Sequence, residues 1–235
     1  MQTRPRILII ATSAATMTGS DKPTGLWLEE LTTPFYAFLD AGAEVTLASI
    51  AGGKVPVDPS SMKPAGENDA SVERALDDPG FQSLIADTPR FDTLDTSGFD
   101  AIVLPGGHGT MFDYPDSEAL AKLVADFDGA GKVVAAVCHG PAGLVGARRA
   151  DGTPVVAGRR VAAFTDSEER AVGLEDAVPF LLTTRLKELG ARIEAGPDFE
   201  PFAIRDGNLV TGQNPASAEP VARLVLDAID GAKRT

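Results

Sequence analysis

The sequence predicts an α/β protein whose parallel sheet is covered by helices on both faces. Short runs of apolar, β-branched residues recur along the chain, as is typical of strands buried on both sides. Amphipathic segments with helical spacing lie between several of these runs. Repeated alternation of strand and helix favours parallel βαβ units.

The elements expected in the first 140 residues follow this alternation. Strands are predicted at Arg6–Ala11, Glu44–Ser49, Ala101–Leu104 and 132–138. A helix over 26–41 is indicated by apolar residues on one side, with Gly42 as its stop; they are Leu28, Leu31, Phe35, Phe38 and Leu39. A second helix is expected over 117–127, with Ser117 as its N-cap.

The later chain predicts a mixture of elements. A strand is expected over 155–164 and a helix over 177–189, which Gly190 closes. Asp206-Gly207 predicts a hairpin within 202–211, and an amphipathic helix over 216–229 follows. Because a structureless loop of the length of 51–98 would be unusual, that segment is interpreted as a small helical insertion. We expect 1–235 to form a single domain with this insertion.

Composition and charge exclude several classes of function. The chain has 235 residues, 43% hydrophobic and 23% charged, which are values of a globular protein. The net charge is −13 and Lys and Arg do not cluster, so no nucleic-acid partner is expected. No apolar run is long enough to span a membrane, and the N-terminal segment lacks the layout of a signal peptide. A single cysteine cannot form an intramolecular disulfide, so a cytoplasmic location is expected.

Cys138 is the first candidate for chemistry. It ends the apolar run 132–138 and precedes His139-Gly140-Pro141, a segment whose Gly-Pro pair opens the next helical stretch. Strand, sharp turn and helix form the layout of a nucleophile elbow, here with cysteine in place of serine. A helix N-terminus favours the thiolate over the thiol. A buried structural cysteine is the alternative, but the strand-end position and the adjacent histidine favour a nucleophile.

Both histidines of the chain follow predicted strands. His139 is adjacent to the cysteine, and His108 lies in the segment PGGHG at 105–109. The carboxyl ends of parallel strands form the edge where open α/β sheets bind ligands. Gly106 and Gly107 would let backbone N–H groups approach a developing oxyanion, so these glycines and His108 are candidate substrate-binding residues.

Carboxylates near the predicted site have competing interpretations. Glu168 and Glu169 follow the strand expected at 155–164, and one of them could orient His139. The alternative is that both are acids that simply stabilise the N-terminus of a helix. Glu30 lies among apolar residues and could act beside the thiol as a general acid or base. Its alternative is a solvent-facing residue of the predicted helix.

These segments together resemble the ThiJ/PfpI superfamily, and within it the glyoxalase III-like chaperone branch. The matching segments cover nearly the whole chain: Thr24-Gly25 with Glu30 and Pro34-Phe35, PGGHG at 105–109, HGTMFDYP at 108–115, AAVCHGP at 135–141, Phe164-Thr165-Asp166 with Glu169, Thr211-Gly212, and NPAS at 214–217. The resemblance implies a flavodoxin-like three-layer sandwich with a mostly parallel sheet. It also implies Cys138 as nucleophile, His139 as its base, Glu169 as the acidic member and Glu30 as the carboxyl beside the sulfur. Glu168 stays open as the alternative acid, and a homodimer is expected.

Two related chemistries fit less well. Class I glutamine amidotransferases use a histidine far downstream of the elbow, and no histidine follows His139. Some relatives hold a metal with two histidines and a carboxylate. With His139 assigned to the elbow, only His108 remains, so no metal site is expected.

The predicted function is therefore a glutathione-independent glyoxalase of the D-lactate dehydratase type. It would convert methylglyoxal, or another small 2-oxoaldehyde, into a 2-hydroxy acid through a hemithioacetal on Cys138, with no cofactor. The alternative is a stress-response holdase chaperone or protein deglycase whose cysteine is sensitive to oxidation.

Overall fold

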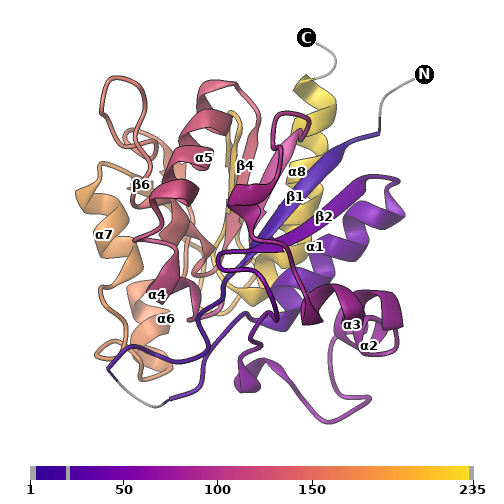
Figure 1. Ribbon diagram of the computed structural model, residues 1–235. Helices are drawn as coiled ribbons and strands as arrows, with labels where there is room; N and C mark the ends of the chain where they lie inside the picture. Colours follow the sequence, from indigo (N-terminus) through magenta and orange to yellow (C-terminus); the bar gives the residue numbers. More distant parts are fainter. Residues whose placement is uncertain (1–3, 20–21, 233–235) are drawn as a thin grey trace.

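A computed structural model describes residues 4–19 and 22–232 of the chain (Figure 1). Met1–Thr3 lie outside the described residues; they begin the N-terminal segment that, by its sequence, lacks the layout of a signal peptide. One sheet has six strands in the order β2-β1-β3-β4-β8-β7. Their bounds are β1 (Arg6–Ala11), β2 (Glu44–Ser49), β3 (Ala101–Leu104), β4 (Val133–Val137), β7 (Ala203–Asp206) and β8 (Leu209–Gly212). A separate pair joins β5 (Arg160–Val161) to β6 (Arg192–Ile193).

The sheet confirms the predicted fold class. All neighbouring strands of the large sheet are parallel except β7, which pairs antiparallel with β8 at the edge. The five parallel strands have the order typical of flavodoxin-like sheets. Four consecutive apolar residues of β1, from Ile7 to Ile10, are fully buried, because helices cover both faces of this strand.

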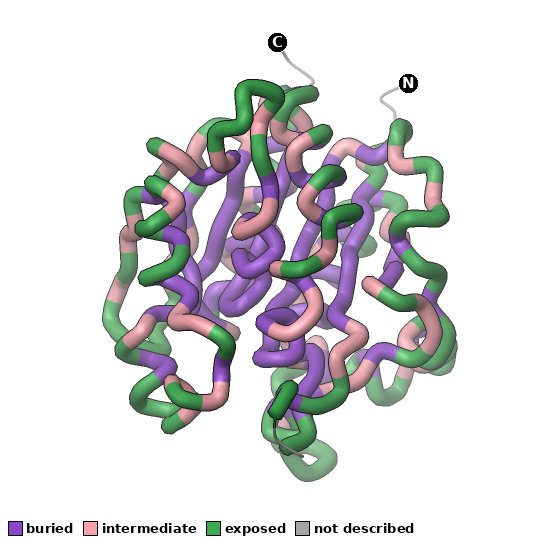
Figure 2. The backbone as a smooth tube through the Cα atoms, turned by 60° about the vertical axis from the view of Figure 1, so that its left-hand side comes forward, coloured by how far each residue is buried: buried purple, intermediate pink, exposed green. Residues whose placement is uncertain are grey.

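Two hydrophobic layers separate the sheet from its helices. Ile7 and Ile9 point to one face, where they join the core of α1 (Leu28–Asp40) and α8 (Ala218–Ala232). Leu8 and Ile10 point to the other face, towards α4 (Thr110–Asp113), α5 (Glu118–Gly129) and α7 (Leu182–Glu188). Figure 2 shows the buried strands between the more exposed outer elements. The helix α6 (Asp166–Ala171) follows β5.

The predicted ends of the first helices are largely confirmed. Gly42 follows α1 with a φ of +81°, a conformation that glycine adopts without strain. Ser117 caps α5, since its hydroxyl accepts a hydrogen bond from the Leu120 N–H at 3.2 Å. The prediction that Leu39 lies on the buried side of α1 is wrong, because its side chain is 39% exposed.

The later elements agree only in part. The hairpin is confirmed: Asp206 pairs with Leu209, and the turn between them uses Gly207 at a φ of +60°. The strand predicted over 155–164 is reduced to Arg160–Val161, because its first residues form turns that end at Gly158, where φ is +76°. The helix predicted over 177–189 begins only at Leu182, after Pro179, whose ring lacks the N–H that a helix interior needs.

The segment 51–98 lies between β2 and β3. It contains α2 (Ala70–Leu76), α3 (Pro79–Ala86), and the 3-10 helices η1 (Pro59–Ser61) and η2 (Phe91–Thr93). Val72 and Phe81 join the core beside α1, whereas Phe91 joins the opposite core layer. The segment therefore contributes to both layers. Within the part of the chain that the structure describes, no helix is long and apolar enough to cross a bilayer.

Candidate active site

Cys138 lies on a sharp turn at the carboxyl end of β4. Its φ is +59°, a left-handed conformation that is uncommon for residues other than glycine. Two backbone hydrogen bonds hold it there: its N–H donates to the Gly212 carbonyl at 2.9 Å, and its carbonyl accepts from the Phe164 N–H at 2.8 Å. The next residues form the short 3-10 helix η3 (Gly140–Leu144). Strained residues of this kind concentrate at functional sites.

A line of polar contacts joins the thiol to a carboxylate. Sγ of Cys138 lies 3.2 Å from Nδ1 of His139, and Nε2 of His139 lies 2.8 Å from one oxygen of Glu169. The other oxygen of Glu169 lies 2.7 Å from Nε2 of His108. The two imidazole rings are 4.1 Å apart between centroids. One carboxylate therefore connects both histidines of the protein.

The charges of these groups follow from their surroundings. Burial, together with the neighbouring His108, lowers the pKa of His139 to about 4. Burial alone would raise the pKa of Glu169, but hydrogen bonds from His108 and His139 lower it to about 2. His139 is accordingly neutral and Glu169 ionised near neutral pH. Because a carboxylate only accepts, His139 donates its Nε2 proton to it, and Nδ1 is left to accept the thiol proton.

Glu168 and Glu169 occupy different environments, although they are adjacent in α6. Glu168 is fully buried, and its Oε2 accepts from the Thr165 N–H at 2.9 Å in a capping box. Its Oε1 accepts from the side chains of Gln213 and Asn214 and from the Phe199 N–H. Of the two candidates that the sequence left open, Glu169 is the one that contacts His139.

Glu30, on the first turn of α1, is fully buried beside the thiol. Its Oε2 accepts a hydrogen bond from the Gly106 N–H at 2.8 Å, and its Oε1 has no partner of normal hydrogen-bond geometry among the described residues. Burial raises the pKa of Glu30 to about 8, against the opposing effect of the Cys138 thiol and the Gly106 amide. The interpretation of Glu30 as a solvent-facing residue is wrong.

The predicted ionisation of the thiol is not supported. Burial and the neighbouring Glu30 raise the pKa of Cys138 well above its ordinary value, although the amides of Gly107 and His139 oppose this. The prediction relied on a helix dipole, but η3 has only five residues of 3-10 helix and supplies little of one. The raised pKa values of the thiol and of Glu30 therefore favour the protonated form of each group in the closed site.

The two glycines after β3 serve different purposes. The Gly106 N–H is occupied by Glu30, so it is not available for an oxyanion, contrary to its predicted role. A Cβ on Gly106 would lie 2.6 Å from the Val137 carbonyl oxygen, which explains the need for glycine there. Gly107 has a φ of +96° and its amide approaches the sulfur. The amides of Gly107 and His139 both interact with the sulfur.

The histidines also correct the argument against a metal site. Ligand atoms of His108, His139 and Glu169 lie within 4.8 Å of one another, so His139 is not withdrawn from such a set by its place in the elbow. Two imidazoles and a carboxylate are a donor set suited to zinc. In this structure, however, both Nε2 atoms are hydrogen-bonded to Glu169 itself.

Sequence reasoning missed the aromatic side of the site. Phe164, which follows β5, packs against His139 with 4.5 Å between ring centroids and against His108 with 6.0 Å. Its position directly after a predicted strand, at the same sheet edge as the histidines, is the signal that could have found it.

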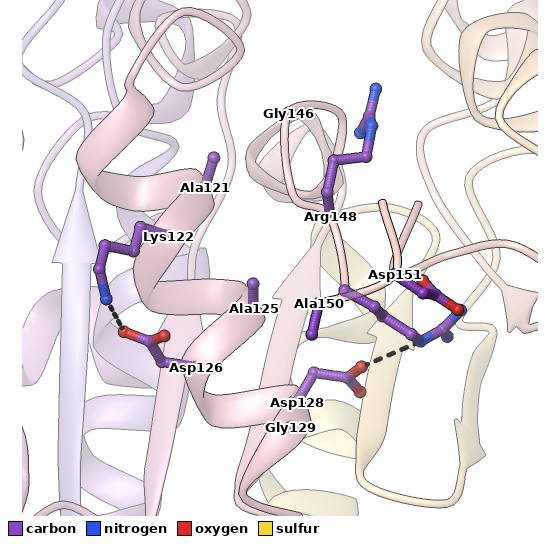
Figure 3. Close-up of a pocket in the computed structure, with 11 residues that line it drawn as sticks. Ala121, Lys122, Ala125, Asp126, Asp128, Gly129, Gly146, Arg148, Ala150 and Asp151 are labelled. Atoms are coloured by element: carbon purple, nitrogen blue, oxygen red, sulfur yellow. Dashed lines mark hydrogen bonds and ion pairs between the residues drawn. The ribbon is translucent and has the colours of Figure 1, made fainter. Parts of the chain in front are cut away.

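One cavity lies away from these residues. An open groove of about 860 Å³ runs between α5 and the loop 146–151, and small residues such as Ala121, Ala125 and Gly146 form much of its wall (Figure 3). Arg149, which also lines the groove, forms an ion pair with Asp128. None of the candidate site residues lines it. By contrast, the thiol centre is closed: Cys138 is 3% exposed, and His139 and Glu30 are fully buried.

Fold and site together define a class: flavodoxin-like α/β proteins with a thiol on the elbow after a central strand, beside an imidazole and a buried carboxyl. Comparison with known proteins identifies the family. The DJ-1/PfpI family matches residues 25–228, and the chain belongs to it. The predicted resemblance is thereby confirmed.

Relatives within this family carry enzymatic names. The chain is 32% identical to Glyoxalase 3 of Candida albicans over 96% of this chain and 98% of that protein. It is also 32% identical to Glutathione-independent glyoxalase HSP31 of Saccharomyces cerevisiae, over 95% of this chain and 98% of that one. The crystal structure of glyoxalase III from Candida albicans superimposes with a TM-score of 0.87 at 30% identity, covering 95% of this chain and 97% of that one.

Proposed function

We propose that this protein is a glutathione-independent glyoxalase that converts methylglyoxal, or a similar 2-oxoaldehyde, into the 2-hydroxy acid. The observation that carries the proposal is the position of the Cys138 thiol. Its Sγ lies 3.2 Å from Nδ1 of His139, and the buried carboxyl of Glu30 interacts electrostatically with the same sulfur. The names of relatives that match over nearly the full chain support it. The reaction is an internal redox exchange between neighbouring carbons, so it needs no external oxidant or reductant.

The first step forms a bond between Sγ and the aldehyde carbon. The thiol proton passes to Nδ1 of His139 while the protonated Glu30 gives its proton to the aldehyde oxygen, which yields a hemithioacetal and leaves Glu30 ionised. The amides of Gly107 and His139, which approach the sulfur, stabilise the oxygen while it carries negative charge. The pKa of Glu30, about 8, keeps it mostly protonated near neutral pH, whereas His139, with a pKa of about 4, is neutral and can accept the thiol proton.

The second step moves a proton between the two substrate carbons. A base removes the proton from the carbon bonded to sulfur, which gives an enediol, and the neighbouring carbon is then protonated. The former aldehyde carbon is oxidised to a thioester while the former ketone carbon is reduced to an alcohol. We assign this shuttle to Glu30, because a fully buried carboxyl with a raised pKa can both accept and return a proton.

The last step is hydrolysis. Water attacks the thioester carbon, the carbon–sulfur bond breaks, and the thiol regains its proton while the 2-hydroxy acid leaves. Glu169 touches neither the thiol nor the substrate carbons in this scheme. It is a positioning residue that fixes the tautomer of His139 through the 2.8 Å hydrogen bond.

A glutathione-free assay of methylglyoxal conversion to lactate tests the proposal. We expect turnover by the wild type, none by Cys138→Ala, and a loss of about 100-fold or more in Glu30→Gln, since general acid–base groups contribute on that scale. Glu118→Gln, an exposed glutamate on α5, is the matched control and keeps the wild-type rate. A wild type that leaves methylglyoxal untouched contradicts the proposal, and full activity of Glu30→Gln contradicts the assigned shuttle.

The alternative of a redox-sensing cysteine receives less support from the site. Sensor thiols are exposed and have lowered pKa values, whereas Cys138 is buried and its pKa is raised. We further propose a homodimer in the cytoplasm as the working state. Light scattering would test the first part, with twice the 24.4 kDa chain mass as the expected result.

A further inference from the structure

Phe199 combines two unusual properties. Its φ is +62°, and within residues 4–19 and 22–232 Cys138 is the only other residue besides the glycines with a positive φ. For a bulky side chain this conformation is an outlier. The ring is nevertheless 49% exposed, so burial of its apolar surface does not compensate for the strain.

A buried polar cluster holds Phe199 in this conformation. Its N–H donates to Oε1 of Glu168 at 2.7 Å, and the same oxygen accepts from the side chains of Gln213 at 3.0 Å and Asn214 at 2.9 Å. Asn214 also donates to the carbonyl of Glu200, the residue after Phe199. Backbone strain persists only where the surroundings determine the conformation, and such strain concentrates at functional sites.

The Phe199 ring leads from the surface to the thiol centre. Its centroid lies 6.3 Å from that of Phe164, with the planes at 62°, and Phe164 packs on His139 and His108. His108 is 8% exposed, more than the other polar groups of the site. Phe164 is itself 5% exposed, so the exposed Phe199 connects the surface to the two histidines through Phe164.

We infer that Phe199 is a specificity-determining residue whose ring contacts the carbon substituent of the 2-oxoaldehyde. This inference rests on the proposed glyoxalase activity. The substrate class it selects is that of 2-oxoaldehydes with an apolar or aromatic substituent, in preference to glyoxal, which carries only hydrogen. An aromatic contact contributes about 0.5–1.5 kcal/mol, which corresponds to about 2- to 10-fold in kcat/KM.

The test compares three substrates and four variants. Steady-state kcat and KM are measured for glyoxal, methylglyoxal and phenylglyoxal with the wild type, Phe199→Ala, Phe199→Leu and Phe199→Gly. Leu84→Ala, which truncates an exposed leucine on α3, is the control for loss of surface hydrophobicity. Phe199→Gly is informative because glycine adopts this φ without strain, so any loss it shows comes from the missing ring.

We expect Phe199→Ala and Phe199→Gly to lower kcat/KM for phenylglyoxal by up to about tenfold, mainly through KM, with about twofold or less for glyoxal. Phe199→Leu falls between them, and Leu84→Ala matches the wild type. Equal effects on all three substrates, or none, overturn the inference, as does a change of oligomeric mass in the Phe199 variants with an unchanged substrate ratio. A wild type inactive on every substrate instead removes the glyoxalase proposal on which the inference rests.

Discussion

Glu30 shows how a single buried carboxyl sets the protonation of the whole centre. Its pKa of about 8 lies far above the ordinary value of 4.5 because burial penalises the charged form. The same group raises the pKa of the Cys138 thiol. Neither residue can be assigned a charge without the other, so the two titrate as a coupled pair.

This raised pKa predicts a pH-dependent stability. The native state retains the Glu30 proton up to about pH 8, whereas the unfolded chain loses it near 4.5. The free energy of unfolding therefore receives its full contribution from Glu30 below pH 4.5 and loses it as the pH rises to 8. Glu30→Gln should remove this slope, which is about 1.4 kcal/mol per pH unit.

Urea unfolding of both proteins at about pH 5, 6.5 and 8 measures the difference. The advantage of Glu30→Gln over the wild type should grow across this range. Other carboxyls with raised pKa values, Glu29 and Asp113, are present in both proteins and cancel in the comparison. Two parallel curves would show that Glu30 ionises in the native state much as it does in the unfolded chain.

The neighbouring glutamates of α6 predict a separation of activity from stability. The side chain introduced by Glu169→Gln can accept only one imidazole N–H and presents its amide hydrogens to the other ring, so one of the two histidines must change its tautomer and the shared arrangement is lost. We expect kcat to fall by about 100-fold or more with the fold retained. Glu168→Gln weakens the hydrogen bonds that the Glu168 carboxyl accepts from Phe199, Gln213 and Asn214. It should destabilise the protein by about 2–3 kcal/mol.

Thermal unfolding and methylglyoxal turnover, measured on both variants, separate the two effects. Equal losses of rate per folded molecule would refute the distinction between the positioning glutamate and the anchoring one. This distinction was out of reach of the sequence, because two adjacent acids in the first turn of a helix carry the same local signal. It depends on Gln213, Asn214 and Phe199, which lie 30 or more residues further along the chain.

At the scale of elements, the close approach of two loops predicts the effect of a glycine substitution. Gly107 has a φ of +96°, and a Cβ there would collide with the backbone of Gly25 and Trp27 at the start of α1. Gly131 has a comparable φ of +68°, and a Cβ there would have open space around it, with no atom within 4 Å. Gly131→Ala should cost about 1–2 kcal/mol, the ordinary penalty for a left-handed residue.

Gly107→Ala should cost more than Gly131→Ala, and it should also lower kcat by moving an amide away from the sulfur. Chemical unfolding and turnover measured side by side check both statements. Similar stability losses in the two variants would mean that the loops can separate without penalty.

The elements themselves were predictable where local patterns are strong. The buried strands β1, β3 and β4 and the helices α1 and α5 follow from apolar periodicity and caps. The strand expected over 155–164 is shorter than predicted: beyond β5 the Ala162 N–H donates to the side-chain hydroxyl of Thr211 in β8 instead of to a backbone carbonyl. Local sequence carries no signal for such a partner.

For the whole molecule, enclosure of the thiol predicts its reactivity. Cys138 is the single cysteine of the chain and is 3% exposed, so any labelling reports on this site alone. We expect a bulky disulfide reagent to react far more slowly with the native protein than with the protein in urea, because reaction requires opening of the structure. Iodoacetamide, which is smaller, should be hindered less. Equal rates in native and unfolded protein would contradict the closed site.

The sequence predicted which residues belong to the site better than it predicted which of them contact one another. Cys138, His139 and Glu30 are candidates on sequence grounds, and the structure brings them together at one edge of the sheet. The contact between His108 and Glu169 was missed, since it joins residues 61 positions apart and neither has a neighbour that signals the other. Packing of this kind depends on the complete three-dimensional arrangement.

The strained turn at Cys138 has a consequence for biosynthesis. Its amide is held by the carbonyl of Gly212, in the strand β8, which pairs with β4 but is translated well after it. A nascent chain on the ribosome cannot secure this turn until Gly212 has been translated and β8 has paired with β4. The catalytic arrangement around the thiol therefore forms only after β8 has been translated and has paired with β4.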